Sequence, residues 1–278
     1  MPAIPAVGTT YDLGGFSQVD NRFYDRGGLC AVLIRDNRGA STSIAPFTAG
    51  SPPTRNFSPF SLDGNLRSDL FIVSLVNGVW VTNTSPNQGF WLIGAIDEKS
   101  GPDRKPAIKH DDAMILQSNF PFDTDITSEG ITITFTPVEP LKPLIRRLRY
   151  NLPLQDGSGN SIVEDPGEAN YVLSKPTSMV YVDRQIILIF ARRKAGGLFL
   201  YTAEGYSLCR LTDIGNVKRD KTNADSGPLG FTVLPDPFHV DLDPSNPLDG
   251  QLVPVLYSTW QGGPAWASLA STQWAVYS

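Results

Sequence analysis

The chain has little of the chemistry that marks metal, redox and nucleic-acid proteins. Its two cysteines, Cys30 and Cys209, are far apart and have neither metal nor redox spacing, so we interpret both as free thiols of a reducing cytoplasm. His110 and His239 are its only imidazole bases. Charged residues make up 18% of the chain, and the net charge is −5. Stable binding to nucleic acid is not expected, because such binding neutralises phosphates with an excess of Lys and Arg.

Long apolar segments are lacking as well. The longest aliphatic and aromatic run is 186–190, far short of a membrane span, and the first residues have neither the positive nor the apolar region of a signal peptide. The 278 residues suffice to bury a full core, and 25 Gly with 23 Pro favour many short strands over helices. We therefore expect a mainly β protein, soluble and intracellular when it is made.

Composition along the chain predicts three parts. Residues 1–68 form an N-terminal segment whose stretch 36–68, rich in Ser, Thr, Pro, Asn and Gly, predicts an extended arm or long loop. A β core covers 69–234, and a Trp-rich extension covers 235–278. Apolar runs predict strands at 71–76, 79–81, 89–96, 131–136, 180–191, 198–202, 205–212 and 230–234, with polar loops at 97–112 and 155–178.

Three local patterns are more specific. Asn77-Gly78 between two apolar runs predicts a tight hairpin turn. Residues 131–136 alternate isoleucine or phenylalanine with threonine, which is typical of a half-buried strand. A helix over about 141–151 is predicted because apolar residues recur at helical spacing and Pro153 follows; these are Leu141, Leu144, Ile145, Leu148 and Leu152.

The motifs with familiar chemistry are all incomplete. Lys109-His-Asp-Asp112 would place neighbouring side chains on opposite faces of a strand, so we interpret it as a solvated loop end. The acidic runs from Asp123 and Asp241 lack the Gly and Glu of a calcium loop. Gly205-Tyr-Ser-Leu-Cys209 lacks the last Gly of a nucleophile elbow, and a strand fits it better. We predict no catalytic residue, no metal site and no cofactor.

Basic clusters and tryptophans are candidate contact surfaces. A cationic run is usually a solvated face; pairing with acidic loops of a neighbouring subunit is the functional alternative. Tryptophans 260, 266 and 274 could form a sugar-stacking platform, although packing in a core or interface is the commoner role. The candidate inter-subunit cations are Arg146, Arg147, Arg149, Arg192, Arg193 and Lys194.

Four segments between 69 and 234 carry a resemblance to a known family. They are 89–98 (GFWLIGAIDE), 129–139 (EGITITFTPVE) leading into the Arg-rich helix, 183–191 (DRQIILIFA) and 206–216 (YSLCRLTDIGN). In their residues and in their order they resemble the major tail tube proteins of long, non-contractile-tailed bacteriophages of actinobacterial hosts. The N-terminal part and the Trp-rich end go beyond the minimal family pattern.

The resemblance implies a β-sandwich or partial barrel flanked by one α-helix. Its subunits would close into rings, typically sixfold, which stack into the tube of the virion tail after synthesis in the host cytoplasm. The implied partners are further copies of the chain, tape measure, tail tip and tail terminator proteins, and DNA that passes without specific binding; no membrane is implied. An acidic lumen would repel phosphate. Candidates for the lumen or for inter-subunit loops are Asp97, Glu98, Asp111, Asp112, Asp123 and Asp125.

Two other functions stay open. A different β-rich virion protein, such as a tail terminator or decoration protein, would form one closed ring and stop. A carbohydrate-binding module would be monomeric and would use the tryptophans; an enzyme is the least expected class. The tail tube hypothesis further predicts that deleting 36–68 leaves a folded core and impairs assembly.

Overall fold

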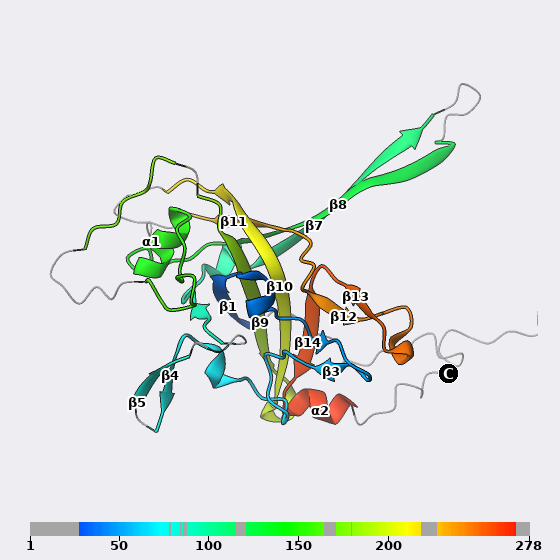
Figure 1. The fold of residues 1–278 in the computed structure, drawn as a ribbon, viewed down its shortest axis with the longest axis horizontal. Coiled ribbons are helices and arrows are strands. Elements are labelled where there is room, and N and C mark those ends of the chain that lie inside the picture. Colours follow the sequence, from blue (N-terminus) through cyan, green and yellow to red (C-terminus); the bar gives the residue numbers. More distant parts are fainter. Residues whose placement is uncertain are drawn as a thin grey trace, which may run out of the picture.

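The computed structural model describes residues 28–270 except 78, 84, 86–87, 115–120, 164–170, 179 and 218–226. The chain is mainly β, with one large antiparallel sheet, small two-stranded sheets and short helices (Figure 1). The strands are β1 (Leu29–Asp36), β2 (Phe47–Thr48), β3 (Thr54–Arg55), β4 (Val73–Val76), β5 (Val79–Thr82), β6 (Trp91–Leu92), β7 (Asp103–Ala113), β8 (Asp123–Phe135), β9 (Asp183–Arg193), β10 (Phe199–Ile214), β11 (Leu229–Val233), β12 (Val240–Leu242), β13 (Leu252–Pro254) and β14 (Ser258–Gly262). The helices are α1 (Pro143–Arg149) and α2 (Pro264–Ala270), with 3₁₀ turns η1 (Gly39–Thr42), η2 (Ser68–Leu70), η3 (Glu98–Ser100), η4 (Ala195–Gly197) and η5 (Pro247–Asp249).

The large sheet branches at its longest strand. Its order is β6-β1-β9-β10-β11-β8-β7, and β14 also pairs with β10. The first part of β10 pairs with β14, and the part after a bulge between Tyr206 and Cys209 pairs with β11. The sheet stays open in the described part of the chain, because β6 and β7 end it without pairing to each other.

Both faces of the central strands are buried, which explains their continuous apolar runs. One face of β1 and β9 packs in a core with α1; its members include Val32, Ile34, Ile186, Leu188, Leu144, Ile145 and Leu148. The opposite face packs under the N-terminal segment; its members include Leu33, Ile187, Ile189, Ile44, Phe57 and Phe60. The sheet is therefore the middle layer of the body.

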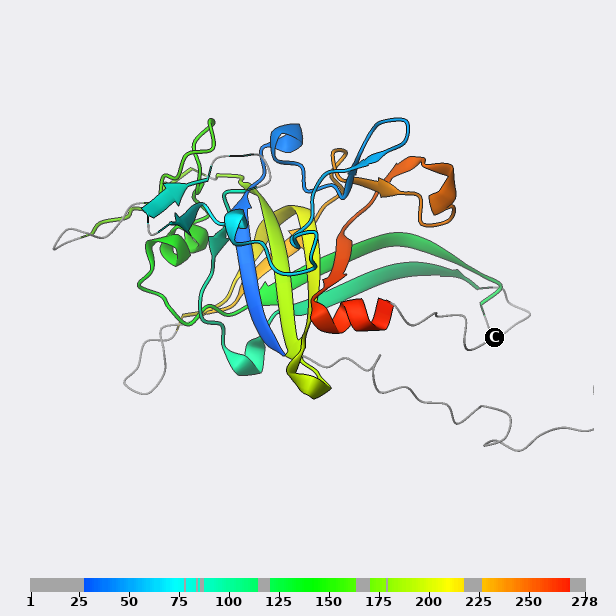
Figure 2. The same ribbon diagram turned by 90° about the horizontal axis from the view of Figure 1, so that it is seen from below.

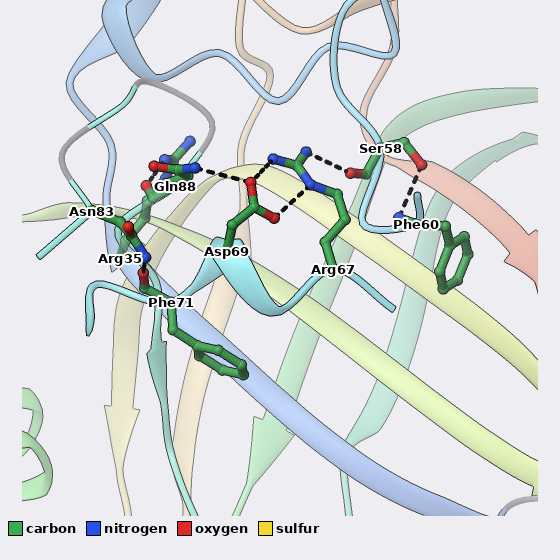
Figure 3. Close-up of polar contacts among 8 residues, drawn as sticks. All are labelled: Arg35, Ser58, Phe60, Arg67, Asp69, Phe71, Asn83 and Gln88. Carbon is green, nitrogen blue, oxygen red and sulfur yellow. Dashed lines mark hydrogen bonds and ion pairs between the residues drawn. The ribbon is translucent and has the colours of Figure 1, made fainter. Parts of the chain in front are cut away.

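Residues 36–68, for which the sequence predicts an extended arm or long loop, are largely irregular and are packed onto the body. The segment contributes Ile44, Phe57 and Phe60 to the core, and polar contacts fix its end (Figure 3). The Arg67 guanidinium donates to both oxygens of the Asp69 carboxylate at 2.9 and 2.7 Å and to the Ser58 carbonyl at 3.1 Å. Since β1 also lies in the sheet, the predicted start of the core near Asp69 does not coincide with a structural boundary.

Several local predictions are confirmed. The β4–β5 hairpin has the expected two-residue connection, since Val76 pairs with Val79 and Asn77 has a φ of 50°; Gly78 lies outside the described residues. Residues 131–135 of the alternating segment form the end of β8. Helix α1 forms with Leu144, Ile145 and Leu148 buried. It is shorter than predicted, because Pro143 occupies its first turn, where the missing N–H costs nothing.

Other local predictions are wrong. Most of the predicted loop 97–112 is strand β7, which lacks an apolar alternation because all its residues are exposed. The predicted strands 198–202 and 205–212 are one strand, β10. Gly205 does not interrupt it: a Cβ there would lie 2.6 Å from the Trp260 ring, so glycine makes room for the indole. A second helix, α2, follows β14 where none was expected.

Candidate functional site

The most exposed regular structure is the hairpin of β7 and β8. Figures 1 and 2 show it leaving the body as a projecting ribbon. Every residue of β7 is exposed, as are residues 123–129 of β8, whereas burial alternates from Gly130 onward. We call residues 107–113 and 122–130 the arm.

One face of the arm continues the buried face of the sheet. Opposite residues of an antiparallel pair share a face, and alternate residues of one strand do so as well. Arg104 pairs with Ile133 and Pro106 with Ile131, and both isoleucines are buried in the core. Further out, the same face carries Ile108, which is 58% exposed. The register shifts between Lys109 and His110, so that His110 pairs with Ile126 and brings Ile126, 69% exposed, to this face as well.

The far end of the arm is acidic. Asp111 lies directly opposite Asp125, and Asp123 and Asp112 flank this pair. Like charges in opposite positions destabilise a strand pair, so this arrangement costs stability in the isolated chain. The hydroxyl of Thr124 donates to Asp112 at 2.9 Å, and His110 Nε2 lies 3.8 Å from the same carboxylate. The tetrapeptide 109–112 is solvated as expected, but it lies on a strand.

The six predicted acidic residues form two separate groups. Asp97 and Glu98 lie at η3, before β7 begins. The Asp97 carboxylate accepts a hydrogen bond from Ser100 Oγ at 2.6 Å, which lowers the pKa of Asp97. The aspartates of the arm lie farther along: Asp111 is eight residues beyond Asp103, the first residue of β7, or about 26 Å at about 3.3 Å per residue.

The two basic clusters are also far apart. The first cluster lies on helix α1 and consists of Arg146, Arg147 and Arg149. The chain just after α1 contacts the start of β9, since Arg184 Nη2 donates to the Leu152 carbonyl at 2.7 Å. Arg192, Arg193 and Lys194 lie at the other end of β9, about 30 Å away by strand rise. There Arg193 Nε donates to the Gly197 carbonyl at 3.2 Å, and its guanidinium lies 5.6 Å from the centre of the Phe199 ring.

A groove of roughly 1070 Å³ lies beside α1. Its cations are Arg146, Arg149 and Lys175, and its apolar residues include Leu141, Ile214 and Val217. No acidic side chain belongs to the lining among the described residues. Leu141 is 77% exposed, although the helical pattern predicted it to be buried, because α1 begins only at Pro143.

The polar groups most suggestive of catalysis are buried inside the body. Ser258 Oγ lies 3.1 Å from His239 Nε2, and Ser207 Oγ lies 2.5 Å from the Asp236 carboxylate, but all four residues are buried. Burial lowers the pKa of His239 to about 4. Ser207 lies within β10, so the strand interpretation of this near-elbow is confirmed. The described residues contain no group of three or more His, Cys, Asp or Glu that could hold a metal ion.

The cysteines are not paired with each other, and the described tryptophans include one that packs against the core. Cys30 and Cys209 are unpaired with each other, as predicted. Burial raises the pKa of Cys30 to about 11 and raises that of Cys209 further. Trp260 packs edge-on against Phe57, with ring centres 5.8 Å apart. Trp266 lies on α2. Trp274 lies outside the described residues.

None of the helices among the described residues combines the length and the apolar character that crossing a membrane requires.

Compared with known proteins, the chain matches no protein-family model and no curated protein sequence.

Sequence reasoning found the charged residues of the arm and of α1 but missed the apolar residues beside them. Ile108 and Ile126 sit among polar residues, where no run or alternation draws attention to them. A usable signal was present in β7: Pro106 and Lys109 in one extended segment are typical of a sheet edge protected against unwanted pairing.

Proposed function

We propose that the chain is a structural virion protein, the major tail tube subunit of a phage with a long, non-contractile tail. Its copies form rings, in this family typically hexameric, and the rings stack into the conduit through which DNA is ejected. The observation that supports this proposal best is the arm, whose apolar residues Ile108 and Ile126 are exposed in the part of the chain that the structure describes.

Exposed β structure of this kind favours contact with another protein. An exposed ribbon edge invites pairing, and a solvent-facing apolar stripe that extends a core face gains stability when it is covered. A second copy of the chain is the occupant required by a tube, because head-to-tail contacts generate rings and filaments. The finer fold proposed with this function is the tail-tube sandwich or partial barrel, completed between neighbouring subunits.

The remaining parts of the proposal follow from charge and from the family. An acidic chain suits a lumen that DNA passes without binding. Asp97 and Glu98 at η3 and the aspartates of the arm remain the candidates for the lumen or for subunit contacts. Tape measure, tail tip and tail terminator proteins are the proposed partners, and the virion tail is the proposed location.

Electron microscopy of the purified chain, with light scattering over a concentration series, tests the proposal. We expect stacked rings or tubes with a central hole. Single closed rings would indicate a tail terminator instead, and a monomer at every concentration would overturn the tube proposal.

A pair of variants links assembly to the arm. Ile108→Ser with Ile126→Ser should prevent assembly and leave the fold unchanged, because both side chains are exposed. Leu248→Ser is the matched control, since Leu248 is an exposed aliphatic residue of η5. Equal assembly by all three proteins would contradict a role for the arm.

A further inference from the structure

The arm and the groove beside α1 are complementary in chemistry. Residues 108–129 contain five carboxylates and a single lysine, together with the exposed Ile108 and Ile126. The groove is lined by three cations, Arg146, Arg149 and Lys175, together with apolar residues. The two surfaces therefore carry opposite charge, which is the complementarity that a docked contact uses.

The two surfaces lie at opposite ends of the molecule. In Figures 1 and 2 helix α1 lies on the left of the body, while the β7–β8 ribbon points to the right. The arm therefore cannot fold back into its own groove without leaving the sheet. The same two surfaces can meet between copies, and a contact between different surfaces of identical chains is head-to-tail by construction.

We propose that the acidic end of the arm of one copy docks in the basic groove beside α1 of the next copy. This pairing rests on the proposed tube function and specifies which surfaces join the subunits. Docking sets the Asp111–Asp125 pair against cations, so the repulsion inside the free arm becomes attraction in the assembly. Ile108 and Ile126 lie on the other face of the ribbon, so they are not part of this charged contact.

The second basic cluster fits the arm less well. Arg193 already binds the Gly197 carbonyl and packs on Phe199 within its own hairpin. Arg192, Arg193 and Lys194 contribute no residue to the groove, so they offer charge without an apolar cavity. This cluster therefore supplies the matched control.

Charge reversal tests the pairing in the full-length chain. One variant reverses the arm (Asp111→Lys with Asp125→Lys), and another reverses the groove (Arg146→Glu with Lys175→Glu). Each alone should raise the concentration needed for assembly by about tenfold or more, because like charges then face each other. An equimolar mixture of the two variants should assemble near the wild-type concentration, since every arm again meets a groove of opposite charge.

The control reverses the other cluster, Arg192→Glu with Arg193→Glu, and should assemble like the wild type. The pairing is overturned if the arm variant assembles normally, if the mixture fails to recover, or if the control loses assembly as much as the groove variant. Recovery in the mixture also shows that both variants are folded. These outcomes leave the tube function standing, whereas a wild-type chain that never assembles removes the tube function itself.

Discussion

The central sheet and the arm are built from the same strands but have opposite surroundings. On β8, Ile131 and Ile133 are buried in the core, whereas Ile126 on the same face lies in solvent. The two strands stay paired across a register shift at Lys109 and His110, but the core no longer covers them beyond it. The comparison indicates that stability and assembly are separable here: the buried part of the ribbon holds the body together, and the exposed part is free to contact another molecule.

The largest effect should come from a charge placed in the covered layer. Leu148→Asp puts a carboxylate at a fully buried position of α1, which loses about 1.5–3 kcal/mol of apolar burial and adds the cost of burying a charge. We expect α1 to detach and the melting temperature to fall by at least about 10 °C. Leu141→Asp, at an exposed position seven residues earlier and ahead of α1, should leave the melting temperature unchanged. Equal melting of both variants would refute the packing described for α1.

The comparison along β8 can be made with one substitution at two positions. Ile133→Ala should lower the free energy of unfolding by about 2–5 kcal/mol, because it leaves a cavity in the core. Ile126→Ala should change it by less than about 0.5 kcal/mol and should weaken assembly instead. Denaturant titration and light scattering measure the two effects. Similar stability losses at both positions would show that the arm is not a separate region.

The body, but not the arm, should respond to acid through His239. Its pKa in the folded chain is about 4, below the 6.5 of a free histidine, so the folded state resists protonation. Its contribution to stability is present above pH 6.5 and is lost as the pH falls toward 4, by about 3 kcal/mol. Unfolding free energies at several pH values should therefore fall more steeply for the wild type than for His239→Gln. Parallel curves would exclude this histidine as the cause.

The smallest effect should come from removing one charge of the arm, which should stabilise the arm and weaken assembly. Asp125→Asn removes the like-charge pair with Asp111, so the arm of the isolated chain should gain about 0.2–0.5 kcal/mol. Amide hydrogen exchange in β7 and β8 should slow accordingly, while assembly weakens because an attractive charge is lost. Asp249→Asn serves as a control at an exposed acid outside the arm. Faster exchange in the arm would contradict the repulsion inferred from the register.

Sequence patterns predicted the structure where one rule acted alone. The alternation at 131–136, the Asn77-Gly78 turn and the face of Leu144, Ile145 and Leu148 all depend on local spacing, and all formed. The arm was missed because its outer residues gain nothing from burial in the single chain, so its strands leave no apolar signature. The role of Ile44 in the core was hidden because it depends on contacts with residues far along the sequence.

The full burial of Cys209 and the partial burial of Cys30 have a practical consequence. With Cys209 enclosed and the pKa of Cys30 raised to about 11, neither sulfur is readily ionised near neutral pH. A cysteine introduced at Ser128, on the polar face of the arm, would therefore react first with a maleimide dye. Because the native thiols react slowly, no other residue has to be replaced. The distance from the arm to a neighbouring molecule can then be followed by energy transfer.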